Sequence, residues 1–287
     1  MTGQPRPPAG LLLRLAGPLQ SWGERSHFSE RDTAGFPTRS GVVGLLALAL
    51  GRTRGEPIDD LTRLGMTVRV DRAGVFLHDF HTVGGGEPNP KATVTTADGG
   101  KRGAKTATLV SHRYYLADAA FTLALTASGE EGHDLLQRCA EALGSPCWPP
   151  YLGRRACPPD QPLLIGLSDR PLEHLVAVPL ARPRPPADTR SVEVEFHGDQ
   201  PLTALPAHDG FPDPDRANDG ADPVGETNDQ PVTFHPGRRW YRPRPRYTRT
   251  LALPAELCGG VGRDYAERLG EFLGSTSRGA DPEGASP

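Results

Sequence analysis

Side chains that could hold phosphates lie together in one short stretch of this chain. Gly153 is followed directly by Arg154 and Arg155. A glycine lets a backbone approach closely, and paired guanidinium groups hold phosphate oxygens with charge-assisted hydrogen bonds. Adjacent loop arginines are often simply solvated, but Tyr151 and Cys157 flank this loop and fix it. The stretch therefore predicts a phosphate clamp.

A second candidate anion site lies at the start of an apolar helix expected over 41–50. Arg39 and Ser40 stand where free N–H groups and the helix dipole favour an anion. The alternative is an ordinary capped helix with a solvated arginine. Thr38 or Ser40 would cap this helix and Gly51 would end it.

Gln20 and Trp22 lie in the loop after an expected first strand. An indole there can stack on a splayed base, and an amide can read the edge of that base. Trp22 could equally plug the end of the sheet. Both interpretations stay open at this point.

Two longer stretches add basic residues. A polar excursion over 84–112 resembles a basic hairpin, or a linker that folds on contact, and Arg113 follows it. Its basic residues are Lys91, Lys101, Arg102, Lys105 and His112, against the two acids Glu87 and Asp98. The stretch 235–253 interleaves arginines with Trp240, Tyr241 and Tyr247 and holds no acid, which favours a surface for single-stranded nucleic acid or a neighbouring protein subunit.

The best catalytic nominee is His81 with Tyr114 or Lys105, as base and acid for attack by a 2′-hydroxyl on the adjacent phosphate. A histidine placed in a strand after Asp79 is more often structural. The four cysteines form no CxxC pair, and no paired carboxylates or metal-ligand cluster stand out. We therefore expect buried free thiols, no metal and no cofactor.

Composition bounds these hypotheses without deciding between them. The 287 residues are 36% hydrophobic and carry a formal charge of −3, which gives no hint of nucleic acid by itself. The longest apolar run, 42–50, is too short to cross a bilayer. We expect a cytoplasmic protein without a membrane segment.

The expected elements are those of an α+β fold. A buried strand over 11–16 and the helix over 41–50 precede strands at 66–70 and 75–80, which are predicted to pair as a hairpin. Further strands at 114–116 and 119–127 lead to an amphipathic helix at 133–143. This order is most of a ferredoxin-like unit, the architecture of the RRM.

The second half is predicted to be smaller and rich in strands, at 163–167, 191–196 and 247–253. An acidic segment rich in Pro and Gly, about 207–229, is expected to be a disordered loop, as is the tail beyond about 275. The expected organisation is a domain over 8–160 with an insertion at about 84–112, a β-rich part over 161–255, and a tail over 256–287.

Five stretches identify a family. They are Leu13 to Gly23 (LRLAGPLQSWG), Phe36 to Gly41 (FPTRSG), Asp79 to Val83 (DFHTV), Tyr115 to Phe121 (YLADAAF) and Tyr151 to Pro158 (YLGRRACP). In this order they closely resemble the CasD family, the handle-binding subunit of type I-E CRISPR Cascade in the RAMP superfamily. The resemblance covers about 11–167. The family usually has Ser where Ala156 stands and Tyr where Phe80 stands.

The resemblance implies an RNA-binding, non-catalytic subunit of an antiviral ribonucleoprotein complex. Such a subunit has a ferredoxin-like RAMP core with a protruding thumb hairpin and grips the 5′ handle of the crRNA. It caps the filament of backbone subunits beside the large subunit that reads the PAM, so it meets target DNA only indirectly. The residues expected to contact RNA are Gln20, Trp22, Arg39, Ser40, His81, Lys101, Arg102, Lys105, Arg113, Gly153, Arg154 and Arg155.

Two rival functions stay open. Relatives in another subtype cut their own guide RNA, so a metal-independent endoribonuclease that processes precursor crRNA is the main alternative. An RRM-like RNA-binding protein outside any CRISPR system is the other.

Overall fold

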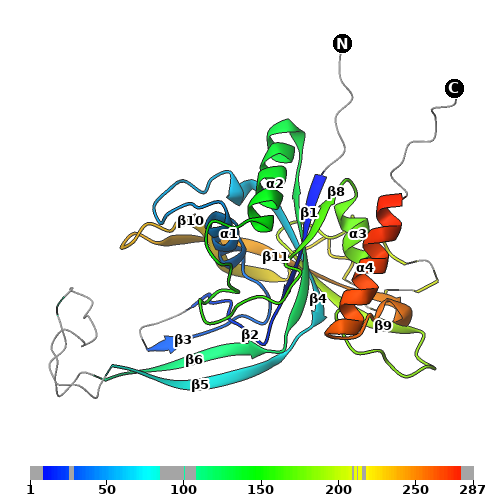
Figure 1. The fold of residues 1–287 in the computed structure, drawn as a ribbon, viewed down its shortest axis with the longest axis horizontal. Helices are drawn as coiled ribbons and strands as arrows, with labels where there is room; N and C mark the ends of the chain where they lie inside the picture. The colour runs from blue at the N-terminus through cyan, green and yellow to red at the C-terminus, as the bar shows by residue number, and fades with distance from the viewer. Residues whose placement is uncertain are drawn as a thin grey trace, which may run out of the picture.

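The protein is described by a computed structural model over residues 9–25, 29–84, 100, 108–208, 210–211, 213–214 and 218–278. A seven-stranded sheet forms its body, with α1 (Arg39–Ala49) and α2 (Gly129–Gly144) in the core of one face and α3 (Pro171–Ala177) and α4 (Arg263–Arg278) on the other (Figure 1). The predicted helices over 41–50 and 133–143 are confirmed. No helix in these ranges is long and apolar enough to cross a membrane.

The first strand explains why a continuous apolar run begins the fold. In β1 (Ala9–Ala16), Leu11 and Leu13 enter the core beneath α1 and α2, whereas Leu12 enters the core beneath α3 and α4. Successive side chains of a strand point to opposite faces, so a strand covered on both faces must be apolar throughout. The exception, Arg14, lies over the ring of Tyr265 from α4, 4.9 Å from its centroid.

Four neighbouring strands of the main sheet are antiparallel in the order β8-β1-β7-β4. They are β4 (Gly65–Arg72), β7 (Ala120–Ala127) and β8 (Leu164–Ser168) beside β1. Helix α1 falls between β1 and β4 in the chain, and α2 falls between β7 and β8. The order of elements in the chain is therefore strand, helix, strand, strand, helix, strand.

Three strands of the second half extend the same sheet past β4. They are β9 (Ser191–Gly198), β11 (Trp240–Pro254) and the edge strand β10 (Gly225–Thr233). The expectation of a disordered loop up to residue 229 is wrong at its end, because β10 begins at Gly225 and buries Asp229. Parts of that loop, 209, 212 and 215–217, lie outside the described residues.

The predicted hairpin between 66–70 and 75–80 is wrong in its pairing. Both strands exist, but β5 (Val75–Val83) pairs along its whole length with β6 (Leu109–Ala117) in a second sheet. The chain changes sheets at Ala73 and Gly74, where the glycine has φ +74°. Alternation predicts that a strand forms, but not which strand it pairs with.

The second sheet projects from the body as a long ribbon of β5 and β6 (Figure 1). Short strands β2 (Leu19–Gln20) and β3 (Glu30–Arg31) pair with the other edge of β6. Residues 109–112 of the predicted excursion therefore belong to β6, in a ribbon that starts at Val75. Residues 85–99 and 101–107, which include Lys101, Arg102 and Lys105, lie outside the described residues.

The last helix corrects the predicted tail. Helix α4 continues to Arg278, past the expected limit of order near 275, and buries Tyr265 and Leu269. Short 3-10 turns at Leu61–Arg63 and Ala255–Leu257 complete the regular elements.

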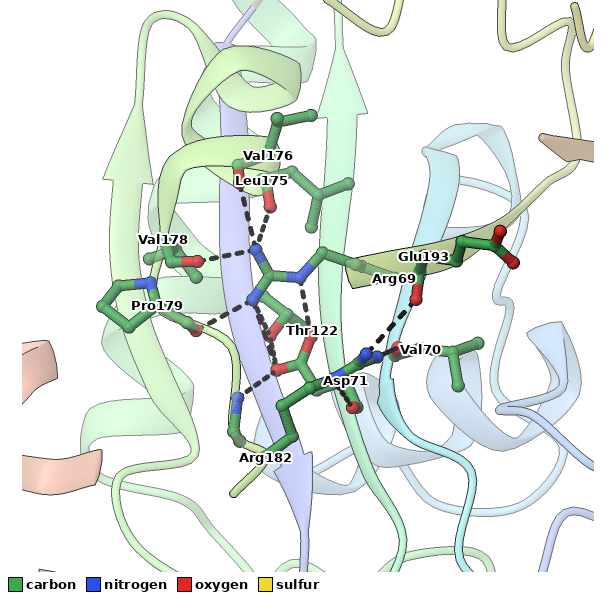
Figure 2. Close-up of polar contacts among 11 residues, drawn as sticks. Arg69, Val70, Asp71, Thr122, Leu175, Val176, Val178, Pro179, Arg182 and Glu193 are labelled. Atoms are coloured by element: carbon green, nitrogen blue, oxygen red, sulfur yellow. Dashed lines mark hydrogen bonds and ion pairs between the residues drawn. The ribbon is translucent and has the colours of Figure 1, made fainter. Parts of the chain in front are cut away.

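A fully buried ion pair fastens the second half to β4. Arg69 donates to Asp71 at 2.6 Å and to the Thr122 hydroxyl at 3.2 Å (Figure 2). It also donates to four backbone carbonyls at the end of α3 and just after it, those of Leu175, Val176, Val178 and Pro179. A guanidinium group matches these helix-terminal carbonyls, which have no partner within the helix. The network therefore fixes α3 against the sheet.

Candidate nucleic-acid interface

An open groove of about 1190 Å³ runs along one face of α1, from Thr38 before its first residue to Arg54 past its last. Five segments of the chain line it: 21–31, the exposed face of α1, 52–58, the stretch 148–158, and the β10–β11 end of the main sheet. Among the described residues its lining carries one carboxylate, Glu24, and six arginines. These arginines are Arg31, Arg52, Arg54, Arg154, Arg155 and Arg239. A concave surface lined by one sign of charge concentrates an anionic ligand.

The turn at 152–157 is built to stand at this groove. Leu152 is fully buried and exchanges backbone hydrogen bonds with Ser21 and Cys157. Gly153 has φ +82°, and a Cβ atom there would overlap the carbonyl oxygen of Ser21. Only glycine fits this backbone position. The structure thus gives the predicted glycine a packing role, and it directs the next two residues into the groove.

Arg154 and Arg155 have different environments. The Arg154 guanidinium lies over the ring of Tyr115, 4.7 Å from its centroid, and donates to the Arg31 carbonyl at 2.8 Å. Its Nη1 is buried without a hydrogen-bond partner in the described part of the chain. Arg155 is exposed. Arg155 is therefore free to meet a phosphate, whereas Arg154 also holds the loop against β6.

Gln20 and Trp22 bury their side chains within the fold. Both are fully buried, and the Trp22 indole donates to the Gln20 amide oxygen at 2.9 Å. Gln20 donates in turn to the carbonyls of Leu15 and Ala119. Gly41 leaves room for the indole, since a Cβ atom there would lie 2.7 Å from it. Core packing accounts for both side chains in this structure, although Trp22 also lines the groove, and their expected base contact stays a prediction.

The sequence interpretation also placed Arg39 at the surface, where it was expected to meet a phosphate, but the structure buries it. Its side chain is 5% exposed, pairs with Asp199 and donates to the carbonyls of Thr62 and Leu64. Burial raises the pKa of the Asp199 carboxyl, and Arg39 opposes this shift. Sequence gave no sign of Asp199, which lies 160 residues further on. Ser40, in contrast, lines the groove.

A second buried carboxylate joins α1 to the arginine-rich wall of the groove. Asp229 accepts two hydrogen bonds from Arg244, at 2.6 and 3.0 Å, and a third from the backbone N–H of Arg39. A bidentate pair of this kind fixes orientation as well as distance. It positions β10 and β11 beside the start of α1.

The predicted single-strand surface at 235–253 divides into two parts. Arg244 and Arg249 are buried and bind acidic partners or backbone carbonyls of this chain. The exposed part is the end of the β10–β11 hairpin, where Arg239 and Tyr241 line the groove and Arg242 lies over Trp240. Composition alone could not separate these two sets, since burial depends on the hairpin pairing.

The ribbon of β5 and β6 separates the nominated catalytic pair. His81 pairs across the ribbon with Ser111, and Tyr114 pairs with His78, so His81 and Tyr114 lie on opposite faces. The His81 ring instead contacts the Asp79 carboxylate at 3.2 Å. Arg113 donates to the Ser111 hydroxyl on the same side as His81. The pairing of His81 with Tyr114 is wrong.

His197 gives a prediction for acid stability. Its ring stacks on Phe36 with centroids 4.1 Å apart, and burial together with Arg246 and Arg244 lowers its pKa to about 4. Its 3.4 Å contact with the Glu195 carboxylate is therefore not an ion pair at pH 7, because the ring is neutral there. The unfolded chain binds this proton near pH 6.5 and the folded chain does so only near 4, so stability falls as the pH falls through this window.

We expect His197→Gln to flatten the loss of unfolding free energy between pH 6.5 and 4, measured by denaturant titration. The matched control is His235→Gln, since His235 is exposed. An acid slope equal to that of the unsubstituted protein would show that His197 does not titrate as described.

The cysteines give a second prediction. Cys139, Cys157 and Cys258 are buried as expected, but Cys147 is exposed, beside the groove residue Trp148. Burial raises the pKa of Cys139 to about 11 and raises those of Cys157 and Cys258. A thiol reagent should therefore label Cys147 quickly in the native protein and the other three only after denaturation. Fast native labelling of Cys147→Ser would contradict this assignment.

A family model described as CRISPR-associated protein (Cas_Cas5) matches residues 10–247. Among curated proteins, the CRISPR system Cascade subunit CasD of Escherichia coli (strain K12) is 36% identical over 168 residues, which are 54% of this chain and 70% of that protein.

Solved structures share the fold as well. A chain of a CRISPR RNA-guided surveillance complex superposes with a TM-score of 0.75 at 42% identity, covering 92% of this chain and 99% of that chain. A crystal structure of a Cas protein superposes with a TM-score of 0.54 at 32% identity, covering 88% and 98% of the two chains.

Proposed function

Because this chain belongs to the CasD/Cas5 family of CRISPR-associated proteins, we propose that it is a non-catalytic RNA-binding subunit of a type I-E Cascade surveillance complex. In this proposal it grips the 5′ handle of the crRNA. The observation that carries the proposal is the arginine-lined groove, which joins Arg155, Arg239 and Ser40 from three distant segments. A single-stranded RNA presents the phosphates that such a groove recognises.

The fold supports this assignment. We infer that the sheet order β8-β1-β7-β4, with α1 and α2 in the intervening connections, is a ferredoxin-like RAMP core. The ribbon of β5 and β6 is then the thumb, and β9 to β11 are the variable second half. The two halves share one continuous sheet, so the proposed boundary near residue 160 lies just before β8 and does not separate two sheets.

The neighbours in the complex are part of the proposal. The structural relative is a chain of an RNA-guided surveillance complex, which favours assembly with backbone and large subunits. In the place proposed, the chain caps the backbone filament and touches target DNA only through the large subunit. Arg102, Lys101 and Lys105 stay candidate RNA contacts on sequence grounds.

The absence of catalysis rests on the geometry of His81. A general base and a general acid must both reach the same scissile phosphate. His81 and Tyr114 lie on opposite faces of the ribbon, and His81 is hydrogen-bonded to Asp79. This arrangement favours a structural or RNA-contacting histidine over an endoribonuclease.

The experiment incubates purified protein with end-labelled repeat RNA in EDTA and follows binding and cleavage together. The expected result is a tight complex with RNA that stays whole, for the unsubstituted protein and for His81→Ala. Cutting at one repeat position that His81→Ala abolishes, with RNA binding retained, would establish the endoribonuclease instead. Failure to bind repeat RNA at all would refute the handle-binding function.

A further inference from the structure

One face of the thumb ribbon carries a row of exposed rings that the groove does not use. Phe76, His78 and Phe80 alternate along β5, and His112 and Tyr114 lie beside them on β6. Phe76 and Phe80 are each 63% exposed. Exposed apolar surface of this kind on a projecting element marks an interaction site.

The rings are ordered against one another. His78 stacks on Tyr114 with centroids 4.8 Å apart and planes 19° apart, and on His112 at 5.0 Å and 17°. Phe80 meets His112 edge to face at 5.5 Å. Phe76 makes no ring contact within the described part of the chain and is the open end of the row.

We propose that this row, Phe76, His78, Phe80, His112 and Tyr114, is a stacking platform for unpaired bases of single-stranded nucleic acid. This inference rests on the proposed function, because it takes a single strand as the ligand. It adds a second contact surface to the groove.

Spacing favours bases as the occupant. Side chains two residues apart on one face of a strand are separated by about 6.8 Å, since each residue rises by about 3.4 Å. Stacked nucleotides rise by about 3.4 Å each, so one base fits between two such layers. Among the described residues no ring contact joins Phe76 to the His78–Tyr114 layer, whereas His112, opposite Phe80, stacks on His78 and so closes the next interval.

Charge and position agree with this occupant. The residues that β5 and β6 place on this face include no carboxylate, while Asp79 points to the opposite face. Tyr115, whose ring the Arg154 guanidinium covers beside the groove, also lies on that opposite face. Aromatic side chains also occur at protein interfaces, but a row of rings on a face without a carboxylate suits flat bases on an anionic backbone.

The test measures fluorescence quenching of 2-aminopurine in a single-stranded repeat RNA, with a single-stranded DNA of the same sequence as the second arm. The variant Phe76→Leu with Phe80→Leu keeps the surface apolar and removes two rings. We expect it to lose most of the quenching and to bind at least about fivefold more weakly, because base stacking on an aromatic ring stabilises by about 1 to 3 kcal/mol. Quenching with both RNA and DNA would show that the platform recognises bases whatever the sugar. Quenching with RNA alone would show that its ligand is the guide RNA strand.

Controls separate this proposal from the proposed function. Val75→Ala with Leu77→Ala alters the opposite face of the same strand and should leave quenching unchanged. Phe80→Trp retains a ring and should retain binding, which guards against a general folding defect. Unchanged quenching and affinity in the double leucine variant would overturn the platform and leave the apolar face to a protein partner. That result would leave the proposed phosphate site in the groove unaffected, because the groove is tested by substitutions at Arg155 and Arg239.

Discussion

Replacing Arg155 and Arg239 by Ala is expected to weaken binding of repeat RNA and to reduce its dependence on salt. Both side chains are exposed and line the groove from different segments. Each phosphate contact with a single strand contributes about −0.7 to the slope of log affinity against log salt concentration, so losing two should make the slope shallower by about 1.4. Fluorescence anisotropy with labelled RNA over a range of salt concentrations measures this change.

The matched control replaces Arg170 and Arg263 by Ala. Their side chains are 60% and 89% exposed, on or beside helices that cover the opposite face of the sheet from α1. This variant removes the same charge and should keep the original slope. An unchanged slope in the groove variant, or an equal change in both variants, would refute the groove as the phosphate site. Arg154 is left in place because it also holds the loop on Tyr115.

Loss of Arg69 is expected to be the most damaging substitution for stability. Arg69 and Asp71 are both fully buried, so Arg69→Ala leaves an uncompensated carboxylate and four carbonyls without their donor. Breaking a buried ion pair from one side costs about 3 to 5 kcal/mol. Denaturant unfolding should show a loss of this size.

Two further variants show whether the loss arises from the unpaired charge. Arg69→Met with Asp71→Asn removes both charges and should recover part of the lost stability. Arg263→Ala breaks an exposed pair with Glu267 and should change stability by less than about 0.5 kcal/mol. A loss below about 1 kcal/mol for Arg69→Ala would show that the buried network does not hold α3 as described.

Local patterns predicted the individual elements of this fold well. The apolar run of β1, the cap and stop of α1, and the amphipathic stripe of α2 were all readable because neighbours in the chain determine them. The pairing of β5 was not readable, since β4 and β5 both alternate and only burial separates them. Strand β4 is covered on both faces, whereas β5 is largely exposed.

The candidate site shows the same division. Gly153 and Arg155 were found because a glycine before two arginines is a local signal. Arg39 was misjudged because its partner Asp199, directly after β9, is distant in the chain. The alternatives for Trp22 stayed open because only the fold places Gln20 against the indole inside the core. The contribution of Arg239 to the groove depends on the β10–β11 hairpin, whose first strand had been assigned to a loop. Long-range pairing therefore decides which of the many arginines are exposed.

Photo-crosslinking from the 5′ handle tests the central claim most directly. A repeat RNA that carries a photoreactive uridine in its 5′ handle is bound to the full chain, irradiated and mapped by mass spectrometry. The account predicts crosslinks to peptides that line the groove, above all at Trp148, Tyr151 and Tyr241, and predicts that they disappear with Arg155→Ala and Arg239→Ala. Handle crosslinks confined to α3 and α4, on the opposite side of the sheet from α1, would contradict it.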